Sequence, residues 1–196
     1  LQADMNFIRK KHISWNACLN AAYNVNSAVS LDEHDIRNNA AIQKGSYMAE
    51  FKERTSLAQI LGRNTIPRVH GGFGTNLSLY GATLEADFSG AAGFSIFNAH
   101  KYIERGLGVI TQGDVERGDY LRLDRLACSY VIPVKIKWMK EFKVAISAYN
   151  LFTITGYDGW NPDVNSFGGV TSSSFGVDYG SFPACRQIVL GLSFRF

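Results

Sequence analysis

The residues from Ile13 to Asn24 alternate between apolar and polar side chains over twelve positions. The odd-numbered positions include Trp15, Leu19 and Tyr23, and the even-numbered positions carry mainly asparagine and serine. Because successive side chains of a β-strand point to opposite faces, this pattern predicts a strand with one apolar and one polar face. Twelve residues are more than most globular strands contain, but they match a tilted crossing of a membrane.

Further segments repeat this period of two, and the sequence predicts seven strands in all. The other six cover 1–8, 69–79, 82–89, 120–132, 142–149 and 187–196. Glu85 and Asp87 lie in the middle of one of them, which favours a polar lumen wall over a dry core. The apolar phase of 120–132 slips near Asp124 and Arg125, which leaves open either a β-bulge or a different register.

The last predicted strand ends the chain on an aromatic residue. Leu190, Leu192, Phe194 and Phe196 share its apolar face. Outer-membrane barrels carry aromatic girdles at the membrane interfaces, and the six residues from Gly191 to Phe196 are similar to a terminal barrel-assembly signal. The alternative is a plain amphipathic strand.

The connections between the predicted strands alternate strictly between short and long. Short connections are expected at 9–11, 80–81 and 133–140, and long ones at 25–68, 90–118 and 151–183. Barrels with tight periplasmic turns and extended extracellular loops show this alternation. Seven strands leave two open edges, which lipid does not tolerate. We therefore expect residues 1–196 to form part of an incomplete transmembrane barrel whose other strands precede Leu1.

Composition excludes several other classes of protein. An aromatic content of 13% with 19% charged residues is unlike that of a disordered chain, and no apolar run is long enough for a membrane-spanning helix. The net charge of +3 is scattered, apart from Arg9–Lys11 and 135–143, which argues against nucleic-acid binding. Cys18, Cys128 and Cys185 are far apart in the sequence, and we predict free thiols.

Composition leaves one further class open, a soluble all-β domain. A mean hydropathy of −0.07 suits such a domain as well as a membrane barrel. A secreted β-sandwich that binds carbohydrate is the specific alternative. It predicts that Trp15, Leu19, Phe88 and Phe194 are buried together in one protein core.

Four sequence blocks, in the expected order, resemble SusC/RagA-type TonB-dependent transporters. Residues 150–165 (NLFTITGYDGWNPDVN) resemble the penultimate strand and loop of that family, which carries NLFT-x-T-x-Y followed by an acidic P-D-V or P-E-V. Residues 67–74 resemble its P-R-x-x-x-G strand start, 118–123 its D-Y-x-R-L strand, and 178–183 its D-x-G-x-Y/F-P element. The blocks span nearly the whole chain.

The resemblance implies an importer in the outer membrane of Bacteroidota, with about 22 strands around a plugged lumen. Residues 1–196 are then the C-terminal segment of its barrel, in contact with outer-membrane lipid and with the C-terminus on the periplasmic side. The resemblance also implies import of oligosaccharides or peptides, with a SusD-like surface lipoprotein and with TonB acting through an N-terminal region outside these residues. The alternative is a SusC-like barrel that serves as a scaffold subunit of a larger outer-membrane assembly.

The sequence predicts neither a catalytic constellation nor a cofactor or metal site, so we expect no enzyme. The four histidines, His12, His34, His70 and His100, are dispersed without ligand spacing. Residues 47–61 have helix-like spacing, and no motif is recognised in 31–61 or 94–114.

Aromatic residues of the last long loop are the best candidates for contact with a substrate or partner, because aromatic faces stack on sugars and anchor interfaces. We predict this role for Tyr157, Trp160 and Tyr179. The alternative is that these side chains pack the loop against itself.

Overall fold

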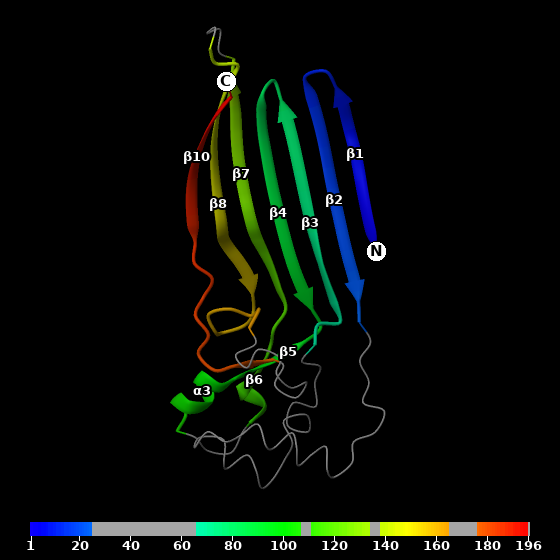
Figure 1. Cartoon of the computed structure of the whole chain (residues 1–196). Helices are drawn as coiled ribbons and strands as arrows, with labels where there is room; N and C mark the ends of the chain where they lie inside the picture. The colour runs from blue at the N-terminus through cyan, green and yellow to red at the C-terminus, as the bar shows by residue number, and fades with distance from the viewer. Residues whose placement is uncertain (25–65, 107–110, 134–137, 165–175, 196) are drawn as a thin grey trace.

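The computed structural model describes residues 1–24, 66–106, 111–133, 138–164 and 176–195. Most of them form a seven-stranded antiparallel sheet in the order β1-β2-β3-β4-β7-β8-β10 (Figure 1). The all-β prediction and the seven expected strands are therefore confirmed. Their bounds are β1 Gln2–Lys10, β2 Ile13–Tyr23, β3 Val69–Leu79, β4 Ala82–Ala92, β7 Tyr120–Ile132, β8 Glu141–Thr155 and β10 Gln187–Arg195.

A β-bulge lies where the apolar phase of β7 slips. Asp87 pairs with Arg125 and Phe88 pairs with Leu123, so Asp124 is the extra residue between them. Of the two possibilities that the sequence left open, a β-bulge and a different register, the structure therefore contains the bulge. The bulge keeps the apolar side chains on both sides of the slip on the same face of the sheet.

The strand β8 adapts to this bulge and is longer than expected. Its Asn150 has a φ of 51°, a left-handed conformation that asparagine tolerates. Pairing with β7 then continues as far as Thr155. The long connection therefore begins at Gly156 rather than at Leu151, because the irregular pairing interrupts the alternation without ending the strand.

The register aligns apolar residues in rows that cross the whole sheet. One row, which includes a member of every strand, is Ile8, Trp15, Leu77, Leu84, Cys128, Ile146 and Leu190. The next row along the strands is polar in its first half, and it consists of Asn6, Asn16, Asn76, Glu85, Ala127, Ser147 and Val189. Adjacent rows lie on opposite faces. The sheet therefore has one apolar face and one mainly polar face.

No described element covers the apolar face. Trp15 is 39% exposed, Ile146 50% and Leu190 68%. Leaving a large apolar side chain in water forgoes about 1.5–3 kcal/mol of burial, so a face of this kind requires an apolar surrounding such as lipid. The β-sandwich alternative is wrong for the described residues, because Trp15, Leu19 and Phe194 are exposed and Phe88 is only half-buried, so the four do not pack in one core.

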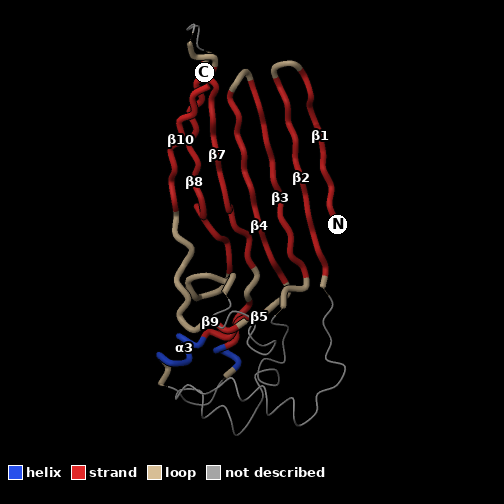
Figure 2. The backbone as a smooth tube through the Cα atoms, viewed as in Figure 1, coloured by secondary structure: helices blue, strands red, loops and turns tan. Residues whose placement is uncertain are grey.

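The two ends of the sheet differ as the connection lengths predict. The turns at Lys11–His12 and Tyr80–Gly81 lie at one end, together with the last residues of β7 and β10, and the ends of β2, β4 and β8 that lead into the longer connections lie at the other end (Figure 2). We call these the short-turn end and the loop end. Tyr80 and Gly81 have φ values of 47° and 91°, as the type I′ turn of a tight hairpin requires.

A small, ordered unit stands at the loop end, and the sequence did not predict it. Its sheet has the order β6-β5-β9, made of β5 Ser95–Asn98, β6 Val115–Arg117 and β9 Val177–Asp178, accompanied by helix α3 Ala99–Glu104 and the 3-10 helix η2 Gln112–Asp114. Together with residues 156–164 and 179–186, these elements are called the loop unit. Its core contains Ile96, Phe97 and Val177, which are almost completely buried.

Within the described residues, no helix has both the length and the apolar character to cross a membrane. The predicted helix at 47–61 and the 31–61 loop fall outside the described residues, whereas β5, α3 and η2 occupy the 94–114 loop.

Candidate functional site

The polar face of the large sheet carries a charged cluster near its centre. Arg125 forms ion pairs with Glu85 and, at 3.5 Å, with Asp87. Asn76 donates a hydrogen bond of 3.2 Å from Nδ2 to Glu85 Oε1. These residues line a depression of about 320 Å³ that also reaches Asp4 on β1. Paired with Arg125, the two carboxylates form a polar wall on this face of the sheet rather than part of a dry core, as the sequence predicted.

The arginine of this cluster was not singled out from the sequence. Arg125 lies forty positions from Glu85, and only the register of β4 with β7 brings them together. The bulge at Asp124 sets that register, because it places Arg125 opposite Asp87. The phase slip was therefore the one available signal.

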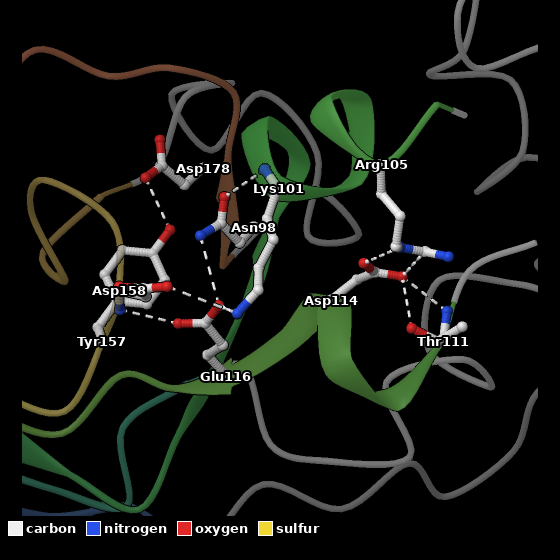
Figure 3. A network of polar contacts seen from close by, with 9 residues as sticks. All are labelled: Asn98, Lys101, Arg105, Thr111, Asp114, Glu116, Tyr157, Asp158 and Asp178. Carbon is white, nitrogen blue, oxygen red and sulfur yellow. Dashed lines mark hydrogen bonds and ion pairs between the residues drawn. The ribbon is translucent and has the colours of Figure 1, made fainter. Parts of the chain in front are cut away.

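Tyr157 holds the last long loop onto the loop unit. Its side chain is only 5% exposed, and its hydroxyl donates a 2.8 Å hydrogen bond to Asp178 Oδ2 of β9 (Figure 3). The other carboxylate oxygen of Asp178 accepts the backbone N–H groups of Gly180 and Ser181. Burial raises the pKa of the Tyr157 hydroxyl, and the bond to Asp178 raises it further. The two residues thus join segments that lie far apart in the sequence.

A second set of contacts joins α3, β6 and the 156–158 turn. Lys101 Nζ lies 2.9 Å from Glu116 Oε1 and 3.6 Å from Asp158 Oδ2 (Figure 3). Glu116 also accepts the backbone N–H of Asp158 at 2.8 Å, and Asn98 caps the helix by accepting the N–H of Lys101. The hydrogen bond to Glu116 raises the pKa of Lys101. Glu116 and Lys101 therefore hold the turn that leads to Trp160 through their contacts with Asp158.

Asp114 anchors the other side of the loop unit. Its side chain is 2% exposed and pairs with Arg105. It also accepts the backbone N–H of Thr111 at 2.7 Å and the Thr111 hydroxyl at 3.0 Å. A buried carboxylate is stable only when its oxygens are satisfied in this way. Asp114 could not be singled out from the sequence, because no periodic pattern marks a charged residue in a loop.

The three predicted contact residues have different surroundings. Trp160 is 67% exposed and Tyr179 43%, whereas Tyr157 lies inside the loop unit. Trp160 borders a pocket of about 110 Å³, whose lining also includes His100, Glu104, Asp158 and Ser181. The structure thus leaves Trp160 and Tyr179 accessible to a ligand and gives Tyr157 a supporting position. Of the other aromatic residues in this long loop, Phe182 is exposed, and Phe167 and Phe175 lie outside the described residues.

The turn before Trp160 needs a glycine. A Cβ atom at Gly159 would come within 2.2 Å of the Tyr157 ring, so any other residue would displace either the turn or the ring. The buried ring of Tyr157 and the missing side chain of Gly159 together determine the direction in which Trp160 leaves the loop unit.

The described histidines and cysteines do not assemble into a site. His100 pairs with Glu104 on α3, His12 stacks on Tyr80, and His70 contacts Asn24. Among the described residues, no group of three or more histidine, cysteine or acidic side chains is placed to hold a metal ion. The three cysteines are exposed free thiols.

We predict that Tyr157→Phe loosens the loop unit without unfolding the large sheet. The change leaves a buried oxygen of Asp178 without its donor, which costs about 1–3 kcal/mol. Faster hydrogen exchange at Gly180 and Ser181 in the full-length protein measures the effect, and Tyr23→Phe, at an exposed tyrosine of β2, is the control. Unchanged exchange in Tyr157→Phe would contradict the supporting role.

Because the pKa of Tyr157 is raised, the stability of the loop unit should depend on pH. The folded loop unit favours the protonated hydroxyl, so this contribution to stability is complete below the ordinary tyrosine pKa of about 10. It is lost as the pH rises from there toward the raised pKa of the folded state. Tyr157→Phe should remove this alkaline loss, which a series of exchange measurements above pH 10 can detect.

The sheet and its ends define the class of protein. An antiparallel sheet with an uncovered apolar face, a polar face, tight turns at one end and an ordered loop unit at the other is part of a transmembrane β-barrel. No protein-family model matches the chain.

Comparison with known proteins shows which transmembrane β-barrels this chain is similar to. The chain is 31% identical to TonB-dependent receptor P3 of Formosa agariphila over 93 residues, and this match covers 44% of this chain and 9% of that protein. The structure of this chain is similar to that of the RagAB peptide importer in the closed-closed state, with a TM-score of 0.72 and 16% sequence identity. The structural match covers 98% of this chain and 28% of the importer chain. The open-open state gives a TM-score of 0.70 and 18% identity over 100% of this chain.

These similarities confirm the predicted resemblance to SusC/RagA-type TonB-dependent transporters, and the structural ones confirm the barrel fold. The chain spans less than a third of the solved chains and less than a tenth of the curated relative. The matched proteins are named as a receptor and as importers rather than as enzymes, which supports the prediction of a protein without catalytic activity.

Proposed function

We propose that the chain forms part of the barrel of a SusC-type, TonB-dependent nutrient transporter in the outer membrane. The observation that carries this proposal is the seven-stranded sheet, whose apolar face no described element covers and whose fold matches an importer over 98% of the chain. The apolar face contacts lipid, and the polar face with Arg125 lines the transport lumen. Residues 1–196 are then the C-terminal segment of the barrel.

The proposed substrates are oligosaccharides or peptides, taken up with a SusD-like surface lipoprotein and driven by TonB. The loop unit supports a role in capture, because hydrogen bonds and ion pairs fix it while Trp160 and Tyr179 remain exposed. A rigid site loses less entropy on binding than a mobile one. We propose these two aromatic residues as contacts for the substrate or for the lipoprotein, with Tyr157 as their support.

Deletion of the gene tests import against the scaffold alternative. We expect growth to fail on at least one oligosaccharide or peptide supplied as the sole carbon source, and to recover when the full-length gene is restored. Normal growth on all of them, with stable co-purification of partners unlike SusD, would instead favour the scaffold subunit.

The proposed orientation places the loop end outside the cell and the short-turn end in the periplasm. We predict that a membrane-impermeant maleimide labels the variant Phe182→Cys in intact cells, because Phe182 is an exposed residue of the loop unit. In a separate variant with Trp138→Cys, the new thiol at the exposed short-turn position should react only after the outer membrane is permeabilised. The reverse pattern would overturn the orientation. Both variants need a background in which all other cysteines are serine.

A further inference from the structure

Three consecutive basic residues lie at the end of β1 and at the start of the turn that leads to β2. Arg9, Lys10 and Lys11 are all exposed, and within the described part of the chain none of them has an ion-pair partner. We call them the basic turn. Like charges this close repel one another, so the fold keeps an unfavourable arrangement that an external anion would relieve.

Three basic residues at the loop end behave differently. Lys101 pairs with Glu116, Arg105 with Asp114, and Arg122 with both Asp124 and Asp163. Positive charge there is used to hold the loop unit together. Among the described residues the basic turn has no such internal role, so its counter-charge lies outside them.

The register places part of the basic turn at the border of the apolar face. Lys10 pairs with Ile13, and Ile13 begins the apolar side of β2 together with Trp15. The rings of Phe7 and Trp15 lie 4.5 Å apart on the same hairpin. A lysine at the edge of an apolar belt extends its ammonium group toward the polar interface.

Exposed aromatic rings continue this border on the neighbouring turn. Tyr80 is 69% exposed and stacks on His12 at a centroid distance of 5.6 Å. Aromatic side chains of this kind sit at the headgroup level of barrels in lipid. Toward the short-turn end, the apolar side chains are therefore followed by a border in which the cations of the basic turn and the rings of His12 and Tyr80 lie together, as at the headgroup level of a phospholipid leaflet.

We propose that the basic turn binds the phosphate headgroup of an anionic phospholipid at the short-turn rim of the barrel. The position of Lys10 favours a lipid over a soluble acidic protein, because a lipid headgroup stays attached to chains that occupy the adjacent apolar face. The site requires that the sheet lie in a membrane. It does not depend on the substrate that is imported.

The test uses the full-length protein in zwitterionic mixed micelles. Its affinity is measured for fluorescent phosphatidylglycerol and for phosphatidylcholine with the same fluorophore. We expect tighter binding of phosphatidylglycerol. Replacing Arg9, Lys10 and Lys11 together by glutamine should weaken that binding by roughly fivefold per charge, because each basic residue near an anionic surface contributes on the order of RT ln 5.

Two further variants keep the result interpretable. Arg68→Gln, Arg117→Gln and Arg186→Gln remove the same charge from exposed positions away from the short-turn end, and they should leave the preference for phosphatidylglycerol unchanged. Exchange within the basic turn that keeps its charge (Arg9→Lys, Lys10→Arg, Lys11→Arg) should retain binding. Equal loss in both glutamine variants, an unchanged preference in the basic-turn variant, or displacement of the lipid by inorganic phosphate at similar concentration would each overturn the proposal.

Discussion

Ala148→Arg should destabilise the barrel in lipid by about 2–4 kcal/mol, whereas Ser147→Arg should change its stability by less than about 1 kcal/mol. The two residues are neighbours in the middle of β8 but lie on opposite faces. Ala148 pairs with Leu126 and Ile188 in the apolar rows, and Ser147 pairs with Ala127 and Val189 on the other face. An arginine near the membrane centre must lose its hydration, whereas one in a wetted lumen keeps it.

Unfolding of the full-length protein by guanidinium in phospholipid vesicles measures this difference. Ala148→Leu separates the effect of charge from that of size, because it enlarges the same side chain without adding a charge and should be close to neutral in lipid. Equal destabilisation by both arginine variants would mean that the two faces have the same surroundings, which would contradict a barrel with one face toward lipid and one toward a lumen.

The large sheet was predictable from the sequence because its signal is local. Alternation between adjacent residues identifies each strand without knowledge of its partner. Even the bulge left a trace, as the slip in apolar phase near Asp124. The extension of β8 to Thr155 was missed because the left-handed Asn150 interrupts the same alternation that marks the strand.

The loop unit was not predictable, because its structure depends on contacts between distant segments. The strand β9 has two residues, and it pairs in parallel with β5, about eighty positions earlier. A strand that short has no measurable period. The same reason explains why Tyr157 was grouped with Trp160. Both are aromatic loop residues in the sequence, and only the bond from Tyr157 to Asp178 shows that one is buried while the other is exposed.

Trp160→Ala should weaken binding of the imported substrate by about 2 kcal/mol, or roughly thirtyfold in affinity. An exposed indole on a rigid turn offers a large flat surface that loses little conformational entropy when a ligand stacks on it. The turn is rigid because Glu116 accepts the backbone N–H of Asp158 and the ring of Tyr157 packs directly against Gly159.

Isothermal titration of the full-length transporter with the oligosaccharide or peptide identified by the growth test measures the effect. Trp138→Ala is the matched control, because Trp138 is 64% exposed at the short-turn end, almost as exposed as Trp160 at 67%. If Trp160→Ala and Trp138→Ala bind the substrate equally well, the indole at 160 is not a substrate contact.

The variant Gly159→Ala tests whether binding needs the orientation of the Trp160 indole or only its presence. It retains the indole, but its new Cβ meets the Tyr157 ring and should change the direction in which Trp160 leaves the turn. We expect a loss of affinity that approaches that of Trp160→Ala. If Gly159→Ala binds normally while Trp160→Ala does not, the indole acts as a mobile contact, and the fixed geometry of the loop unit is not required for binding.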